Sequence, residues 1–431
     1  MRPILFITGL LASLSCFADS HLNQEQRLGE RLFRDTNLSL NKNVACATCH
    51  GLKPANADFF QTQRVPGFVD PINIRTGAPV SIGSIPGTVG SLNAPSLGYT
   101  AFSPDFFRDE EGETYVGGQF WNGRASNLVE QAKMPFLNPV EMAMPNEAAV
   151  VERLTLDFVY LRQFREVFGL NLKTIDRPLR SKAAKVSEVF KAIAKAISEY
   201  EKSSLFSKFN SKFDYVIVGK TEFTEEEAKG LALFNGKANC LACHVSEVTI
   251  GQDGGIQPPL FTDFTYDNIG LPRNINIPGN PEPNLGLGGR QDLPADVLAD
   301  ENGKHKVMSL RNIAITAPYG HNGSMASLEE IVHFYNTRDT LGRVTDLNQP
   351  GFGINGWPEP EVSANVNSDE LGNLGMTADE EKALVAFLKT LTDDYPQWGN
   401  DRRVPPWSRP PYQPLSDNKL RQRLSIRRIA N

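Results

Sequence analysis

Two copies of the pattern Cys-x-x-Cys-His set the strongest limit on what this chain can fold into. Two thiols at this spacing can form thioethers with the two vinyl groups of a haem, and the next residue, histidine, can then bind the iron. A lone C-x-x-C could be a redox dithiol or half of a zinc site, but two complete copies favour two covalently bound haem c groups. The expected haem-binding residues are Cys46, Cys49 and His50, and then Cys240, Cys243 and His244.

The N-terminal segment has the pattern of a signal peptide. Arg2 supplies a positive charge before an apolar run at residues 4–17, which is too short for a comfortable transmembrane helix. We expect residues 1–18 to be removed on export, and a lipid-modified Cys16 is the alternative. Because Cys16 is the fifth cysteine, the mature chain then has none outside the haem motifs. Haem c attachment outside the inner membrane indicates a bacterial periplasm.

Charge is distributed unevenly along the chain. The formal net charge is −6, yet residues 396–431 contain eight Arg or Lys and two Asp and so carry +6. The acidic body disfavours nucleic acid as a partner, and no apolar run after residue 17 approaches the length of a transmembrane segment. The basic tail either docks an acidic partner or a membrane surface, or is a solvated or wrapped extension. The sequence does not indicate the oligomeric state.

The residues before each haem motif form a repeat. Residues 23–33 and residues 224–234 each predict a short helix that contains a glycine and ends at a phenylalanine, followed by a loop and the first cysteine. This is the usual construction of a small cytochrome c domain, and it occurs twice. We therefore expect an all-α fold of two cytochrome-c-like haem domains with long ordered loops and a tail rich in Pro and Arg. The expected boundaries are residues 19–205, 206–395 and, for the tail, 396–431.

Apolar residues at helical spacing predict further helices within these domains. They cover residues 150–168, 186–200 and 377–391. Residues 64–118 and 250–304 are rich in turn-forming residues, so we expect long ordered loops there, of the kind that often wrap a cofactor or carry function.

The positions of the histidines bear on the far side of the first haem. The chain has six histidines, and none lies between His50 and His244. The first haem therefore has no nearby histidine as a sixth ligand, although Met134 or a tyrosine could take that place. An electron carrier needs two strong axial ligands on each iron, whereas a peroxidase needs one iron with an open face.

Three further blocks resemble the bacterial dihaem cytochrome c peroxidase family. They are Gln-Phe-Trp-Asn-Gly-Arg at residues 119–124, Asn-Pro-Val-Glu-Met at residues 138–142, and residues 309–323. The resemblance runs from about residue 23 to residue 395. It implies two all-helical haem domains, reaction with hydrogen peroxide, and a calcium ion at the domain interface. The implied calcium ligands, which offer oxygen, are Asn93 and the backbone oxygens of Thr316 and Pro318.

The resemblance also implies roles for four side chains. Trp121 is similar to a tryptophan that relays electrons between the haems, with simple core packing as the alternative. Gln131 and Glu141 match a polar pair over the peroxide-binding iron, and Pro135 matches a proline that lines the same pocket. A carboxyl group there can take a proton from hydrogen peroxide and deliver it to the leaving oxygen.

Two departures from the ordinary peroxidases resemble the MauG-type branch of this family. The loop after the first motif lacks the histidine that caps the iron in ordinary members, and Tyr335 stands where they have a methionine ligand to the second haem. A tyrosinate ligand stabilises high oxidation states, whereas methionine raises the potential. Met325 and His321 are rival ligands, and the remaining alternative is that Tyr335 is simply buried in the core.

The resemblance leads us to expect a periplasmic enzyme that uses hydrogen peroxide to oxidise a secreted protein through a high-valent state with both irons as Fe(IV). One alternative is a dihaem cytochrome c peroxidase that reduces peroxide to water with electrons from a small cytochrome or cupredoxin. The other is a non-catalytic dihaem electron carrier. Ala238 stands where the maturation enzyme of methylamine dehydrogenase has a surface tryptophan, which disfavours a methylamine dehydrogenase precursor as the substrate.

Overall fold

The computed structural model describes residues 22–52, 65–174, 179–250, 256–279 and 282–412. The expected signal peptide, Cys16 and most of the basic tail lie outside these ranges. Within them, no helix is both long enough and apolar enough to cross a membrane.

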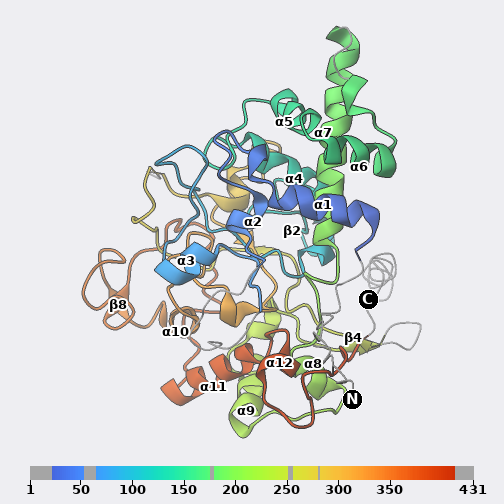
Figure 1. Ribbon diagram of the computed structural model, residues 1–431. Helices are drawn as coiled ribbons and strands as arrows, with labels where there is room; N and C mark the ends of the chain where they lie inside the picture. The colour runs from blue at the N-terminus through green and yellow to red at the C-terminus, as the bar shows by residue number, and fades with distance from the viewer. Residues whose placement is uncertain (1–21, 53–64, 175–178, 251–255, 280–281, 413–431) are drawn as a thin grey trace, which may run out of the picture.

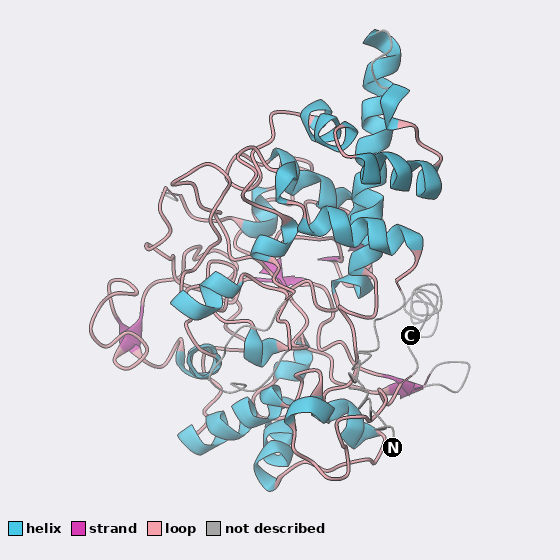
Figure 2. Ribbon diagram, in the orientation of Figure 1, coloured by secondary structure: helices cyan, strands magenta, loops and turns pink. Residues whose placement is uncertain are grey.

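The fold is mostly helical, and its helices gather toward two ends of the molecule with long loops between them (Figures 1 and 2). Helices α4, α5, α6 and α7 lie with α1 and α2 toward one end, and α8, α9, α11 and α12 lie toward the other. The helices are α1 (Gln24–Arg34), α2 (Cys46–Cys49), α3 (Pro71–Thr76), α4 (Leu128–Leu137), α5 (Glu147–Thr155), α6 (Phe158–Phe168), α7 (Leu179–Glu201), α8 (Lys212–Ile217), α9 (Glu225–Phe234), α10 (Leu328–Thr337), α11 (Ala378–Lys389) and α12 (Tyr395–Trp398).

The long loops contain short strand pairs, which the expected all-α class does not include. Extended segments that run side by side satisfy each other's backbone donors and acceptors, so loops this long form ladders where they meet. The antiparallel pairs are β1 (Phe107–Asp109) with β2 (Thr114–Val116), β3 (Thr249–Ile250) with β4 (Ile256–Gln257), and β5 (Tyr266–Asp267) with β6 (His305–Lys306). The strands β7 (Gly342–Arg343) and β8 (Gly356–Trp357) pair in parallel.

One expected helix is divided in two. Residues 150–168 form the end of α5 and all of α6, and the break falls at Leu156 and Asp157. The Asp157 side chain accepts a hydrogen bond from the backbone N–H of Val159 at 2.7 Å, which caps the start of α6. An aspartate at this place starts a new helix rather than continuing the old one. The expected helices at residues 186–200 and 377–391 correspond to α7 and α11.

Two large hydrophobic cores lie along the described chain. One contains residues from Leu28 to Phe206, and the other contains residues from Phe213 to Leu391. A smaller cluster of Tyr215, Tyr395 and Val404 packs against Trp398. The domain boundary between residues 205 and 206 stays a prediction.

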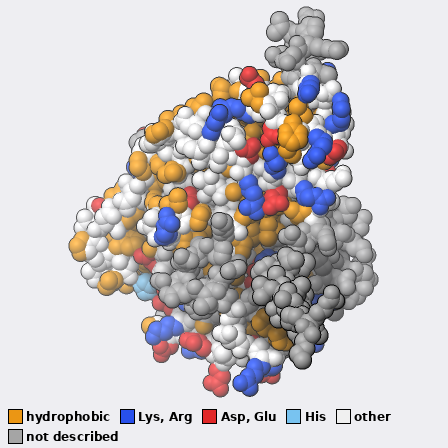
Figure 3. Space-filling model, in the orientation of Figure 1, with side chains coloured by type: hydrophobic (Ala, Val, Ile, Leu, Met, Phe, Trp, Pro, Cys, Tyr) orange, Lys and Arg blue, Asp and Glu red, His pale blue; other side chains and the backbone are white. Residues whose placement is uncertain are grey.

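Exposed ion pairs lie on the end of the molecule formed by α6 and α7. Arg162 of α6, for example, lies 3.8 Å from Glu166. On the face in Figure 3, basic and acidic side chains are interspersed over this end. Because such pairs are exposed to water, each contributes at most about 1 kcal/mol to stability.

A glycine in the first helix of each repeat allows two helices to cross closely. A Cβ atom on Gly29 of α1 would lie 1.9 Å from the carbonyl oxygen of Ala196 on α7. A Cβ atom on Gly230 of α9 would lie 2.0 Å from the carbonyl oxygen of Ala383 on α11. Both contacts are against backbone, which cannot swing aside. The repeated glycine of the sequence is therefore the contact point of each helix pair.

We expect the substitution Gly230→Ala to lower the free energy of unfolding by about 1–3 kcal/mol, because α9 and α11 must separate to admit the methyl group. Chemical denaturation of the haem-containing protein, followed by circular dichroism, measures the change. Gly90→Ala is the control, since its nearest neighbour would be 3.5 Å away. Equal stability of the two variants would contradict the close crossing.

Candidate haem sites

The first haem motif lies on a single short helix. Cys46 and Cys49 occupy the ends of α2, and the backbone N–H of His50 donates to the carbonyl oxygen of Cys46 at 2.9 Å. The His50 Nδ1 lies 3.2 Å from the carbonyl oxygen of Phe68, which leaves Nε2 for an iron. Burial lowers the pKa of His50, so the imidazole is neutral, as iron ligation requires.

The second motif repeats this geometry. The backbone N–H of His244 donates to the carbonyl oxygen of Cys240 at 2.8 Å, and its Nδ1 lies 2.9 Å from the carbonyl oxygen of Phe261. Burial lowers the pKa of His244 to about 4. Phe68 and Phe261 both have φ of +54°, so the same backbone bend aims both carbonyls. In each case a proline stands two residues earlier, a signal that the sequence analysis did not use.

Gln131, Pro135 and Glu141 lie together in the cavity of the first motif, which Cys46, Cys49 and His50 also line. Gln131 and Pro135 are four residues apart on α4 and therefore share one face of the helix. Glu141 follows the end of α4 and enters the cavity from the loop. The structure thus brings the expected polar residues and proline to one place.

Opposing effects act on the Glu141 carboxyl. Burial raises its pKa, while the charge of Arg124 and a hydrogen bond from Asn138 lower it, and the net shift is upward. The Asn138 Nδ2 donates to Glu141 Oε1 at 2.6 Å. Since Asn138 also caps the end of α4, it holds the carboxyl in a fixed position.

Glu201 also lines this cavity, and the sequence analysis missed it. It is the last residue of α7 and is 3% exposed. Burial raises its pKa to about 8. Its Oε2 atom has no hydrogen-bond partner within the described part of the chain. A glutamate at the end of a helix is usually at the surface, so only the fold reveals this one.

Tyr335 lies in the larger cavity around the second motif, together with Cys240, Cys243 and His244. The hydroxyl is buried there, which raises its pKa. His321 also lines this cavity, but its Nε2 lies 2.9 Å from Glu361 Oε2. The other rival, Met325, is fully buried and is not among the cavity-lining residues described.

Both cavities fit a covalently bound haem. Each contains a complete Cys-x-x-Cys-His set, and the second has an apolar wall from α10 and α11. Burial raises the pKa of all four thiols, so they are held uncharged in apolar surroundings. The partnerless Oε2 of Glu201 gives the first cavity a polar atom that the protein leaves unsatisfied. The apolar wall of the second includes Leu328, Ile331, Val332, Leu384 and Leu388.

Trp121 lies on the wall of the second cavity, where that cavity adjoins a smaller one lined by Asn93, Thr316 and Pro318. Its Nε1 donates to the carbonyl oxygen of Asn93 at 2.8 Å. Its own carbonyl oxygen accepts from the backbone N–H of Lys306 at 2.8 Å. The first bond orients the indole, and the second fixes the backbone that carries it.

The three residues expected to bind calcium are neighbours. Asn93, Thr316 and Pro318 line the same small cavity, and Asn93 Nδ2 lies 3.3 Å from the carbonyl oxygen of Pro318. The amide is oriented with nitrogen toward this oxygen. A cation would require the opposite orientation, with Oδ1 toward the ion. The calcium site stays a prediction.

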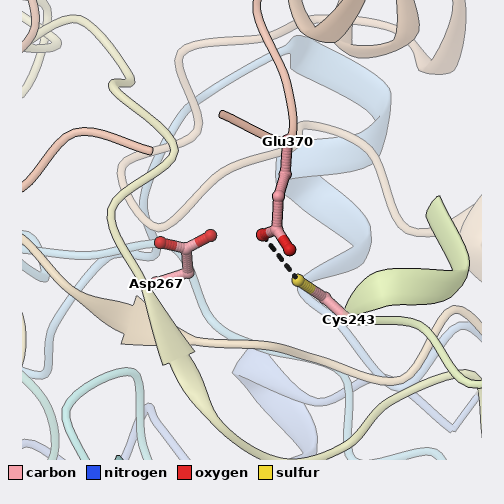
Figure 4. Close-up of side chains that lie close together, drawn as sticks. All are labelled: Cys243, Asp267 and Glu370. Carbon is pink, nitrogen blue, oxygen red and sulfur yellow. Dashed lines mark hydrogen bonds between the residues drawn. The ribbon is translucent and has the colours of Figure 1, made fainter. Parts of the chain in front are cut away.

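Two carboxylates lie beside the attachment point of the second haem. Glu370 Oε2 is 4.0 Å from the Cys243 sulfur, and Asp267 faces the same space (Figure 4). Asn367 Nδ2 donates to one oxygen of each carboxylate at 2.7 Å. Because the Cys243 sulfur is expected to attach a haem, this group is better understood as part of the expected haem surroundings than as a separate metal site.

The buried Glu201 gives a prediction about stability and pH. Between pH 4.5 and about 8 the unfolded chain loses the Glu201 proton while the native protein keeps it, so stability falls as pH rises. Glu201→Gln removes this loss and should be more stable than the wild type at pH 8, by a few kcal/mol at most. The difference should shrink toward pH 4.5.

Thermal melting of the haem-containing protein at several pH values measures this effect. Glu199→Gln is the control, because Glu199 lies on the same helix but pairs with Lys202 near the surface at 2.8 Å. A Glu201 variant that follows the wild type at every pH would show that the native carboxyl is ionised.

Comparison with known proteins places this geometry in a family. Residues 23–222 match the family described as di-haem cytochrome c peroxidase. The MauG protein of Paracoccus denitrificans, a methylamine utilization protein, is 40% identical over 372 residues, which cover 85% of this chain and 88% of that protein. The cytochrome c551 peroxidase of Nitrosomonas europaea is 30% identical and covers 86% of this chain and 80% of its own.

Solved structures agree with this assignment. The dihaem peroxidase BthA from Burkholderia thailandensis superimposes with a TM-score of 0.69 at 26% identity, over 90% of this chain and 91% of its own. The enzyme described here therefore carries two haem c groups and acts on hydrogen peroxide. The chain belongs to the di-haem cytochrome c peroxidase family.

Proposed function

We propose that this enzyme uses hydrogen peroxide to oxidise a protein substrate, as a MauG-type member of its family. The observation that carries the proposal is the tyrosine at position 335 in the same cavity as His244. A tyrosinate oxygen donates charge to an iron and stabilises its high oxidation states. Burial raises the pKa of the Tyr335 hydroxyl, so a bound haem iron would be needed to stabilise the anion.

When bound, the two haems supply the iron that reacts with peroxide and hold the oxidising equivalents. Glu141 accepts the first proton of hydrogen peroxide and returns it to the leaving oxygen, and its raised pKa suits both steps. Asn138 keeps the carboxyl in position, and Gln131 offers an amide to the same space. Pro135, which has an apolar ring and no N–H donor, lines the wall of the same cavity.

Trp121 is the electron relay in this proposal. Its indole borders the second cavity, and the hydrogen bonds to Asn93 and from Lys306 fix its ring and backbone. The calcium ion would bind Asn93 and the carbonyls of Thr316 and Pro318 beside it. An ion there would hold together segments that are more than 200 residues apart in the sequence.

The substrate is an exported protein in this proposal, and the enzyme acts in the periplasm after loss of residues 1–18. Ala238, which is buried before the second motif, offers no aromatic ring for electron transfer. The second candidate function is reduction of peroxide with electrons from a small redox protein. The relationship to the Nitrosomonas peroxidase favours it, while Tyr335 disfavours it.

The first test adds one equivalent of hydrogen peroxide to the fully oxidised protein without any reductant. We expect a long-lived species with a near-infrared band in the wild type and no such band in Tyr335→Met, because methionine cannot stabilise the oxidised second haem. Tyr319→Phe is the control, since Tyr319 lines the same cavity but donates to the carbonyl oxygen of Ile313. A wild type that reacts only after partial reduction would support the second candidate.

Glu141→Gln tests the proton transfer. We expect the second-order rate of reaction with peroxide to fall by about 10²–10⁴, because an amide cannot accept the proton. Stopped-flow absorbance in the haem bands measures the rate. Glu130→Gln is the matched control, since Glu130 lies on α4 but pairs with Lys133 at 2.7 Å. An unchanged rate in the Glu141 variant would remove this residue from the reaction.

A further inference from the structure

Lys306 differs from the other buried cations of this protein. Five Lys or Arg residues are buried in the described ranges, and four of them form ion pairs with carboxylates. The fifth, Lys306, is 5% exposed and has no carboxylate partner among the described residues. The four paired cations are Lys212, Arg290, Arg311 and Arg338, with Glu227, Asp292, Asp214 and Asp339 as their respective partners.

Within the described ranges, the Lys306 ammonium group has only neutral neighbours. Its Nζ donates to Ser103 Oγ at 2.5 Å and to the carbonyl oxygen of Gly118, and it lies 5.4 Å from the centre of the Phe264 ring. Burial without a compensating charge lowers the pKa of Lys306 to about 7. A buried charge is costly unless an anion accompanies it. The position therefore calls for an anion that the polypeptide does not supply.

Lys306 lines the cavity of Cys240, Cys243 and His244, and it also borders the adjoining small cavity. No other Lys or Arg is among the lining residues described for the haem cavity. A haem brings two propionate carboxylates into this space, on the edge of the ring opposite the thioether bonds. Lys306 and the propionates that could pair with it would therefore lie in one cavity.

The acidic groups of the cavity disfavour a haem that is turned the other way, with its propionates beside Cys243. Asp267 and Glu370 lie beside Cys243, at the thioether edge. A propionate there would meet like charges, whereas at Lys306 it would meet an unpaired cation. Both attachment chemistry and charge therefore direct the propionates toward Lys306.

We propose that Lys306 binds a propionate of the second haem and ties it to the Trp121 segment. The side chain already contacts Gly118, three residues before Trp121, and the backbone N–H of Lys306 donates to the Trp121 carbonyl. One residue would then join the haem edge to the relay tryptophan. This proposal requires two haems but not a MauG-type reaction, so it and the proposed function can fail separately.

The test substitutes Lys306 in the haem-containing protein and measures both haem midpoint potentials by spectroelectrochemistry from pH 6 to pH 9. We expect Lys306→Met to lower one potential and make it pH-dependent, because the propionate loses its partner and titrates in this range. Lys306→Arg should retain the wild-type potentials. Lys382→Met is the control, since the exposed Lys382 pairs with Asp379 at 3.5 Å and is not among the cavity-lining residues described.

Unchanged potentials in a fully loaded Lys306→Met protein would overturn the proposal. If that variant does not assemble, Ser103→Ala removes one hydrogen bond while keeping the charge, and should shift the same potential by a smaller amount in the same direction. Redox difference infrared spectra of the wild type give an independent answer. A propionate that is ionised at pH 6 supports the pairing, and a protonated one contradicts it.

Discussion

Each half of this enzyme depends on a pair of helices that cross at a glycine and on the haem that fills the space beside the crossing. Gly29 and Gly230 bring α1 against α7 and α9 against α11 at backbone distance. The haem motif follows the first helix of each pair after a short loop, so the crossing decides where the thiols lie. The walls of the second cavity are largely apolar side chains, which a bound haem would cover from water. Haem attachment therefore contributes to folding as well as to chemistry.

The two halves use the same scaffold to give their irons different surroundings. Both axial histidines are oriented by a carbonyl from a bent phenylalanine, at Phe68 and Phe261. The residues that line the two cavities differ. The first cavity contains Glu141 and Glu201, whose pKa values are raised by burial, whereas the second contains Tyr335, with Asp267 and Glu370 beside Cys243. Under the proposed function, the first cavity would carry the proton transfer and the second would retain oxidising equivalents.

Several helices and one residue of the candidate site could be predicted from the sequence. Helical spacing and the repeat before each haem motif located α1, α9 and α11, and the family resemblance carried by the Asn-Pro-Val-Glu-Met block indicated Glu141, which lines the cavity of the first motif. The break before α6 was missed, because the apolar spacing continues through Asp157 while its side chain caps a new helix.

Burial and backbone geometry could not be predicted in the same way. Glu201 and Lys306 are ordinary charged residues in the sequence, and only tertiary packing removes them from water. The carbonyls of Phe68 and Phe261 carry no side-chain signal, although the proline two residues before each could have indicated a bend. The strand pairs depend on which distant loop segments meet, and no local pattern encodes that meeting.

The two carboxylates beside Cys243 would act in one direction on an iron bound in the second cavity. Asp267 and Glu370 lie at the Cys243 edge, and the neutral amide of Asn367 binds both without cancelling their charge. Negative groups near an iron stabilise its oxidised forms, as an anionic oxygen ligand also does. A propionate neutralised by Lys306 adds no further negative charge at the edge nearest Trp121, so an electron can leave that tryptophan without crossing a strongly negative region. Surroundings of this kind would make an iron a poor acceptor of electrons from a small carrier protein, in agreement with the proposed oxidation of a protein substrate.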